Sequence, residues 1–182
     1  MIIGFDLDGV IADHTLAKIK LAADLGCNIS EKETPSEIFN HILPNEILKV
    51  VQGNLYNKVH PNSFLMSGAD EAISKIKTLG IRYFLISRRK GPESAIGFLE
   101  KYNLWPQYFD KSNSFFVLEK EDKDTKSKEL GVTHYFDDEF GVLEKLKSVS
   151  NKFLFDSHGV FPENALYTKV SSWEDIKKQL HI

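Results

Sequence analysis

The sequence predicts an α/β fold: a Rossmann-like parallel sheet with helices on both faces, plus a small helical cap inserted after the first strand. From residue 67 onwards, short apolar segments alternate with longer amphipathic ones, which is typical of such a sheet. A polar, broken and mostly helical stretch follows the first apolar segment and interrupts this alternation. The length of 182 residues, 42% of them hydrophobic, suffices for one domain with a small insertion.

Local patterns predict the first strand and the insertion. Ile2–Phe5 is apolar and β-prone, which indicates a buried strand. Apolar residues at helical spacing predict a helix over 13–25, ended by a glycine. A second helix start is at Thr34, where a capping threonine precedes a proline and, three residues on, a glutamate; a third follows at Pro44. Residues 14–66 are therefore predicted to form a helical cap.

The remaining elements alternate regularly. Glycines after helices and a proline at the start of one helix mark their ends. The predicted elements are helix 67–79, strand 81–86, helix 92–102, strand 115–118, helix 123–130, strand 134–136, helix 140–147, strand 153–155 and helix 172–180. Residues 1–13 and 67–182 are thus predicted to form the core domain.

Composition excludes several function classes. The formal net charge is −3, whereas proteins that bind a nucleic acid polymer usually have a basic surface, so we expect no such partner. The single cysteine, Cys27, excludes an internal disulfide and a cysteine-cluster zinc site, and it fits a reducing compartment. No apolar run is long enough to span a bilayer and no signal peptide is seen, so we expect a cytoplasmic protein with no membrane partner. Oligomeric state is not predicted.

Polar side chains follow several of the predicted strands. Asp6 and Asp8 come directly after the first strand, Ser87 follows strand 81–86, and Asp137 follows strand 134–136. In parallel sheets, ligand-binding groups gather at the carboxyl ends of the strands. Taken alone, an Asp-x-Asp-Gly motif is often only a turn, and paired aspartates often only begin a helix. Their joint occurrence at strand ends instead favours a site for phosphoryl transfer.

These motifs, in this order, resemble those of the haloacid dehalogenase-like phosphohydrolases. The resemblance covers nearly the whole chain and is carried by Asp6-Leu7-Asp8-Gly9-Val10, Ser87 after Tyr83-Phe84-Leu85-Ile86, Lys123, and Phe136-Asp137-Asp138. The early insertion and the late segments Phe153–Asp156 and Ser172–Ile176 look closest to the 5′(3′)-deoxyribonucleotidase branch.

The resemblance implies unequal roles for the two aspartates of the first motif. Asp6 would attack phosphorus and form an aspartyl-phosphate, while Asp8 would protonate the leaving oxygen and later take a proton from water. Mg²⁺ would be held by the carboxylates of Asp6 and Asp137 and the backbone carbonyl of Asp8, with Asp138 nearby through water. We also expect anionic, low-dielectric surroundings to keep the proton on Asp8.

The resemblance also implies groups that bind the phosphate. Ser87 would donate to a phosphoryl oxygen, and Lys123 would neutralise charge on the nucleophile and the phosphate. Lys123 lies fourteen residues before Asp137, the family spacing, and Lys126 is the alternative in the same charged stretch.

Substrate contacts are predicted from the insertion and from the segment after Ser87. Arg88, in the basic run 88–90, either meets a phosphate or is solvated. His14 stands where the deoxyribonucleotidases carry a base-stacking aromatic ring, so Phe39, Tyr56 and Phe64 are the candidates for stacking. The alternative is that these rings form a small core within the cap.

The predicted function is a Mg²⁺-dependent phosphatase acting on a small phosphorylated metabolite, with a nucleoside monophosphate as first candidate. A sugar-phosphate or phosphoglycolate-type phosphatase is the alternative within enzymes. A non-catalytic module that binds phosphate or nucleotide is the alternative outside them.

Overall fold

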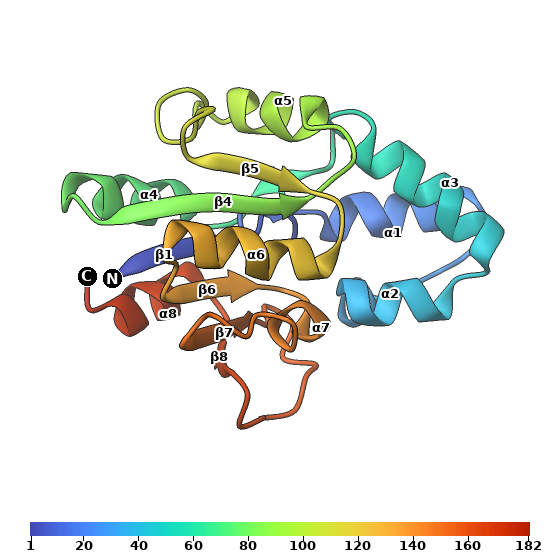
Figure 1. The fold of residues 1–182 in the computed structure, drawn as a ribbon. Coiled ribbons are helices and arrows are strands. Elements are labelled where there is room, and N and C mark those ends of the chain that lie inside the picture. The colour runs from blue at the N-terminus through green and yellow to red at the C-terminus, as the bar shows by residue number, and fades with distance from the viewer.

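The computed structural model describes residues 1–182 and is built on a six-stranded parallel sheet (Figure 1). The strand order is β5-β4-β1-β6-β7-β8. The bounds are β1 Ile2–Phe5, β4 Arg82–Arg88, β5 Ser114–Val117, β6 His134–Asp137, β7 Asn151–Phe155 and β8 Thr168–Val170. This confirms the predicted fold class.

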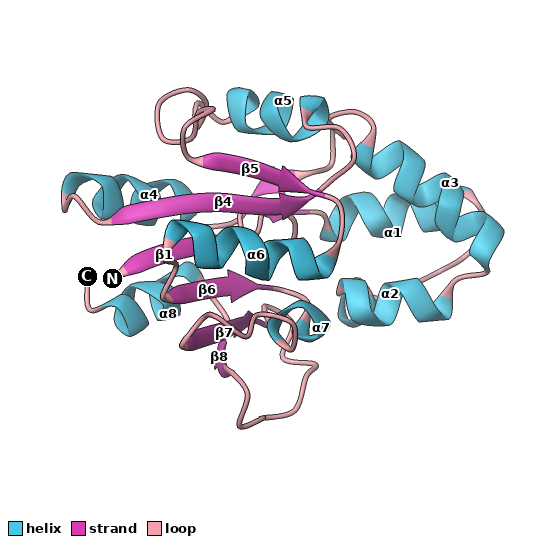
Figure 2. Cartoon of the chain, in the orientation of Figure 1, coloured by secondary structure: helices cyan, strands magenta, loops and turns pink.

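Helices cover both faces of the sheet (Figure 2). The bounds are α4 Ala69–Thr78, α5 Glu93–Lys101, α6 Lys120–Leu130, α7 Phe140–Leu143 and α8 Trp173–Leu180. The larger apolar core lies on the face that α4, α5 and α8 cover, and a smaller one lies under α6 and α7. Burial on both faces explains why the strands are continuous apolar runs rather than alternating ones.

The central strand β1 is packed closely against its neighbours. The rings of Phe5 and Phe136 stack with centroids 5.4 Å apart. A Cβ atom at Gly4 would lie 2.5 Å from the ring of Tyr135, so only glycine fits at that position. The chain passes from β1 to β4 and β5 on one side and then returns to β6, β7 and β8 on the other, which makes the carboxyl end of β1 the switch point of the sheet.

The segment between β1 and α4 lies beyond that end of the sheet (Figure 1). Its elements are β2 Ala12–Asp13, α1 Thr15–Asp24, a 3₁₀ turn Glu31–Glu33, α2 Ser36–Ile42, α3 Asn45–Tyr56 and β3 Phe64–Leu65. The short strands β2 and β3 pair antiparallel where the segment leaves and re-enters. Ala22, Phe39, Leu43 and Val51 form a separate small core within it. The division into a cap, 14–66, and a core domain stays a prediction.

Some element ends differ from the predicted ones. Helix α6 begins at Lys120, three residues early, because Glu119 and Asp122 form a reciprocal capping box. Thr34 does not cap α2; its hydroxyl donates to the carbonyl of Glu31, and the helix begins at Ser36. The three-residue strand β8 was not predicted, since so short a segment carries no period of its own. No helix combines the length and hydropathy that a membrane crossing requires.

Candidate active site

Three predicted site residues meet at the switch point of the sheet. Asp6 follows β1, while Ser87 and Asp137 end the flanking strands β4 and β6. All three line one cavity of about 580 Å³, whose lining includes only two hydrophobic residues. Residues of α3 in the insertion, Lys49 to Tyr56, line the same cavity. Sheet topology thus brings together residues more than a hundred positions apart in sequence.

Lys123 ties two of these acids together. Its Nζ lies 2.9 Å from Asp6 Oδ1 and 2.7 Å from Asp137 Oδ2, and its side chain is 2% exposed. Burial would lower the pKa of Lys123, but the charges of Asp137 and Asp6 raise it well above its usual value. Lys126, the alternative lysine, pairs with Glu129 instead and does not line the cavity.

A cluster of carboxylates suits a hard divalent cation. Ligand oxygens of Asp6, Asp137 and Asp138 all lie within 4.8 Å of one another. Burial raises the pKa of Asp137 to about 7 although Lys123 opposes the rise, and burial together with Glu139 and Asp137 raises that of Asp138 well above its usual value. The single ammonium of Lys123 therefore does not compensate the negative charge of these carboxylates. Mg²⁺, which prefers oxygen ligands, would compensate the remainder.

Gly9 allows the cluster to form. Its φ is +78°, in the left-handed region, and a Cβ there would lie 2.4 Å from the carboxyl group of Asp138. The loop after β1 can approach Asp138 so closely only with glycine at this position.

Asp8 lies in the opposite electrostatic environment. Its Oδ1 accepts hydrogen bonds from Nη2 of Arg89, at 2.5 Å, and from Nε2 of His14, at 2.7 Å. Burial would raise the pKa of Asp8, but Arg89 and His14 outweigh burial and hold it well below its usual range. The expectation that Asp8 keeps its proton is therefore wrong for this state of the site, because its nearest partners are donors rather than anions.

His14 supports Asp8 and has its polar ring atoms occupied. An ionised carboxylate only accepts hydrogen bonds, so Nε2 carries the hydrogen that Asp8 receives. Nδ1 lies 2.7 Å from the hydroxyl of Ser63, and the ring is buried between Tyr56 and Phe98. The imidazole of His14 therefore binds Asp8 and has no free ring face on which a substrate could stack.

The other predicted substrate contacts separate into two groups. Tyr56 and Arg88 line the cavity, and Arg88 is 42% exposed, 3.7 Å from Glu139. Phe39 does not line the cavity. It is 1% exposed and lies in the small core of the insertion, and the ammonium of Lys18 is 5.2 Å from its ring centroid. The ring of Phe39 is therefore part of a core within the insertion, which was the predicted alternative, and it is not available for stacking on a substrate.

Arg89 was missed at the sequence level. It stood in a run of three basic residues, and such runs usually face solvent. A signal was nevertheless present, because Arg89 is two residues after Ser87 and side chains two apart share one face of a strand. Only the fold shows that Arg89, not its neighbours, reaches Asp8.

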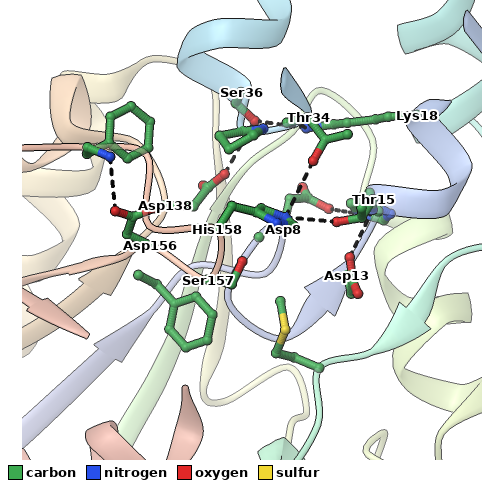
Figure 3. Close-up of a pocket in the computed structure, with 16 residues that line it drawn as sticks. Asp8, Asp13, Thr15, Lys18, Thr34, Ser36, Asp138, Asp156, Ser157 and His158 are labelled. Carbon is green, nitrogen blue, oxygen red and sulfur yellow. Dashed lines mark hydrogen bonds and ion pairs between the residues drawn. The ribbon is translucent and has the colours of Figure 1, made fainter. Parts of the chain in front are cut away.

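A second, smaller pocket shares Asp8, Ser36 and Asp138 with the larger cavity (Figure 3). There the side chains of Thr15 and Thr34 point towards Nε2 of His158, at 3.2 and 3.5 Å. The buried Nζ of Lys18 donates to the Thr34 carbonyl and to Ser36, whose hydroxyl donates to Asp138. These contacts join the insertion to the carboxylate cluster.

The fold is shared with proteins of known structure. No protein-family model and no curated protein sequence matches the chain. A HAD-superfamily hydrolase from Ehrlichia chaffeensis is 13% identical, with 99% of this chain and 95% of that one covered and a TM-score of 0.63. The chain has the fold of the haloacid dehalogenase-like hydrolases.

Two further solved structures share this fold. A HAD family hydrolase from Deinococcus radiodurans R1, solved with bound phosphate and sodium, is 13% identical over 98% of this chain and 94% of that one, with a TM-score of 0.68. A predicted phosphatase from Clostridium acetobutylicum is 17% identical, with 99% of this chain and 98% of that one covered and a TM-score of 0.63. Identities this low show the fold alone, and none of the three is described as a nucleotidase.

Proposed function

We propose that the chain is a Mg²⁺-dependent phosphatase that hydrolyses a small phosphomonoester through an aspartyl-phosphate on Asp6. The observation that carries this proposal is the pairing of Asp6 with Lys123 at the switch point, inside a polar cavity that also contains Ser87 and Asp8. A carboxylate nucleophile, a buried ammonium and a hydroxyl donor together match the needs of phosphoryl transfer.

The chain's own residues account for both half-reactions. In the first, an Asp6 oxygen bonds to phosphorus while the bond to the leaving oxygen breaks, and that oxygen takes the proton of Asp8, which enters this step protonated and leaves it ionised. In the second, water attacks the phosphorus of the aspartyl-phosphate, gives its proton to Asp8, and releases phosphate and the Asp6 carboxylate. The ion pairs around Asp8 favour the ionised form that the second step needs.

Mg²⁺ would be held by Asp6 and Asp137, with Asp138 and the Asp8 carbonyl nearby. When bound, it offsets the negative charge of the carboxylates and of the phosphoryl group. Lys123 contributes positive charge to the same region and fixes the orientation of Asp6 and Asp137.

The substrate class follows from the cavity wall that the insertion supplies. Lys49, Gln52, Tyr56 and Asn57 line it, and Arg89 covers the ring of Tyr56 with its guanidinium carbon 5.2 Å from the ring centroid. A polar lining favours a sugar phosphate over a nucleoside monophosphate, which requires a free stacking surface. Both stay candidates for the small phosphorylated metabolite.

The test is hydrolysis of p-nitrophenyl phosphate and of a panel of sugar phosphates and nucleoside monophosphates, with Mg²⁺ and with EDTA. We expect activity only with Mg²⁺, and a loss of about 10⁴-fold or more in kcat for Asp6→Asn. Asp24→Asn, an exposed aspartate on α1, is the matched control and should retain full activity.

Two outcomes would contradict the proposal. Unchanged hydrolysis by Asp6→Asn would remove the assigned nucleophile. Phosphate binding by the wild-type chain without turnover of any ester would favour a non-catalytic module.

A further inference from the structure

Asp8 and Arg89 form a buried pair that leaves part of the arginine unused. Nη2 of Arg89 donates to Asp8, while Nη1 donates to Ser94 at 2.8 Å and to the carbonyl of Tyr56 at 3.3 Å. The side chain is only 8% exposed, yet its Nε–H is buried with no hydrogen-bond partner. An unpaired buried N–H of a charged group costs free energy, so its presence requires an explanation.

The geometry of the guanidinium group indicates what would satisfy this N–H. Nε–H and one Nη2–H point in parallel along one edge of the planar group, which matches two oxygens of a phosphate or carboxylate. In this structure Nη2 donates to Asp8, and the Nε–H of the same edge has no partner. A tetrahedral oxyanion would occupy both.

A second unpaired donor lies near the end of β4, two residues before Arg89. The hydroxyl of Ser87 is buried, 1% exposed, and has no hydrogen-bond partner. Ser87 and Arg89 are two residues apart, and both line the cavity next to Asp6 and Lys123. Two unpaired donors in the cavity that Asp6 also lines point to an anionic ligand that would bind both.

We propose that Arg89 is a phosphate-binding residue that exchanges partners: it holds the Asp8 carboxylate in the free protein and binds the transferring phosphoryl group in the substrate complex. This inference rests on the proposed phosphatase function. Asp8 then keeps its hydrogen bond to His14 and is released from Arg89 when substrate arrives. Arg89 thus couples phosphate binding to the freeing of the residue that transfers protons.

The neighbouring arginines have no such arrangement. Arg82 lies at the opposite end of β4, exposed, over the ring of Phe84. Arg88 points to Glu139. Arg82→Met is therefore a matched control, because it removes the same group from the same strand at a distance from the cavity.

The decisive measurement is the dissociation constant of inorganic phosphate in the presence of Mg²⁺, by calorimetry, for the wild type, Arg89→Met, Arg89→Lys and Arg82→Met. We expect Arg89→Met to weaken phosphate binding at least about tenfold, the scale of a lost charged hydrogen bond, and Arg89→Lys to recover only part of it. Arg82→Met should bind like the wild type. Phosphate affinity in Arg89→Met within about twofold of the wild type would overturn the inference.

A double-mutant cycle tests the exchange itself and does not depend on the folding of one variant. If Asp8 competes with phosphate for Arg89, Asp8→Asn should bind phosphate several-fold tighter, and this gain should vanish when Arg89→Met is added. A gain of the same size in both backgrounds would show that Asp8 only repels phosphate, and would overturn the exchange.

The binding data also separate this inference from the proposed function. Arg89-dependent phosphate binding by a wild-type chain that hydrolyses no ester would support the anion site and reject the phosphatase. Ester hydrolysis by the wild type, with a phosphate affinity that Arg89→Met does not change, would support the phosphatase and reject the role of Arg89 in phosphate binding. Added methylguanidinium should partly restore phosphate binding to Arg89→Met, which a purely structural role of Arg89 would not allow.

Discussion

Asp6 and Asp8 lie two residues apart on one loop, but their surroundings are opposite. Asp6 faces the buried acids Asp137 and Asp138 and shares the single ammonium of Lys123 with Asp137. Asp8 faces the guanidinium of Arg89 and the imidazole of His14. Burial accordingly raises the pKa of Asp6, while the partners of Asp8 lower its pKa despite burial.

The contrast shows how one motif yields two roles. The side lined by Asp6 has excess negative charge, which a bound cation would offset. The side lined by Asp8 is already balanced by donors from the residue after β4 and from the insertion. Function therefore depends on which distant segments the fold brings to each carboxylate.

The largest effect is expected from Lys123→Met, which disturbs the Asp6 side. The substitution keeps the apolar stem but leaves two buried carboxylates without their shared ammonium. We expect the free energy of unfolding to fall by about 3–5 kcal/mol at pH 8 in EDTA, measured by urea denaturation. Lys126→Met, which loses an ion pair with Glu129 and a cation–π contact with Phe115, should change stability by less than about 1 kcal/mol. Equal effects of the two substitutions would contradict the assignment.

A pH dependence distinguishes the two sides. The folded-state pKa of Asp137, about 7, is above the ordinary value of 3.8, so its stabilising contribution is full below pH 4 and is lost as pH rises to 7. Without divalent cations, stability should fall by about 2–3 kcal/mol between pH 5 and pH 8. Asp8, with its lowered pKa, affects stability only below about pH 4, where protonation begins to remove its contribution.

Urea denaturation at several pH values in EDTA checks this slope. Asp137→Asn should reduce it, and Asp24→Asn, an exposed control, should not. Mg²⁺ should stabilise the wild type more at pH 8 than at pH 5, because it binds the ionised acids. Stability that rises from pH 5 to pH 8 in EDTA would show that the Asp6 side is not short of positive charge.

Sequence patterns predict the Asp6 side better than the Asp8 side. Asp6, Lys123 and Asp137 follow strands or keep a fixed spacing, and parallel topology alone then requires that the strand ends meet. The order of the core helices and strands was predicted for the same reason, since it depends on local periodicity.

The Asp8 side depends on contacts that local sequence patterns do not single out. Arg89 looks like Arg88 and Lys90 in the sequence, and Ser63 lies in a loop that is forty-nine residues from His14. Which of these groups reaches Asp8 is decided by how the insertion packs on the sheet. The expectation that Asp8 keeps its proton is wrong for the free protein, because the shift in its pKa comes from such distant partners rather than from the motif itself.

The smallest effect is expected from Ser63→Ala, which disturbs only the Asp8 side. Its hydroxyl bonds Nδ1 of the buried His14, so its loss should cost about 1 kcal/mol of stability and, by loosening His14 against Asp8, lower kcat for p-nitrophenyl phosphate several-fold. Affinity for Mg²⁺, measured by calorimetry, should not change, because Ser63 does not contact the acids of the Asp6 side. Ser112→Ala, at an exposed serine bonded to Asp110, is the control and should alter neither quantity. A weaker Mg²⁺ affinity in Ser63→Ala would mean that the two sides of the loop act as one unit.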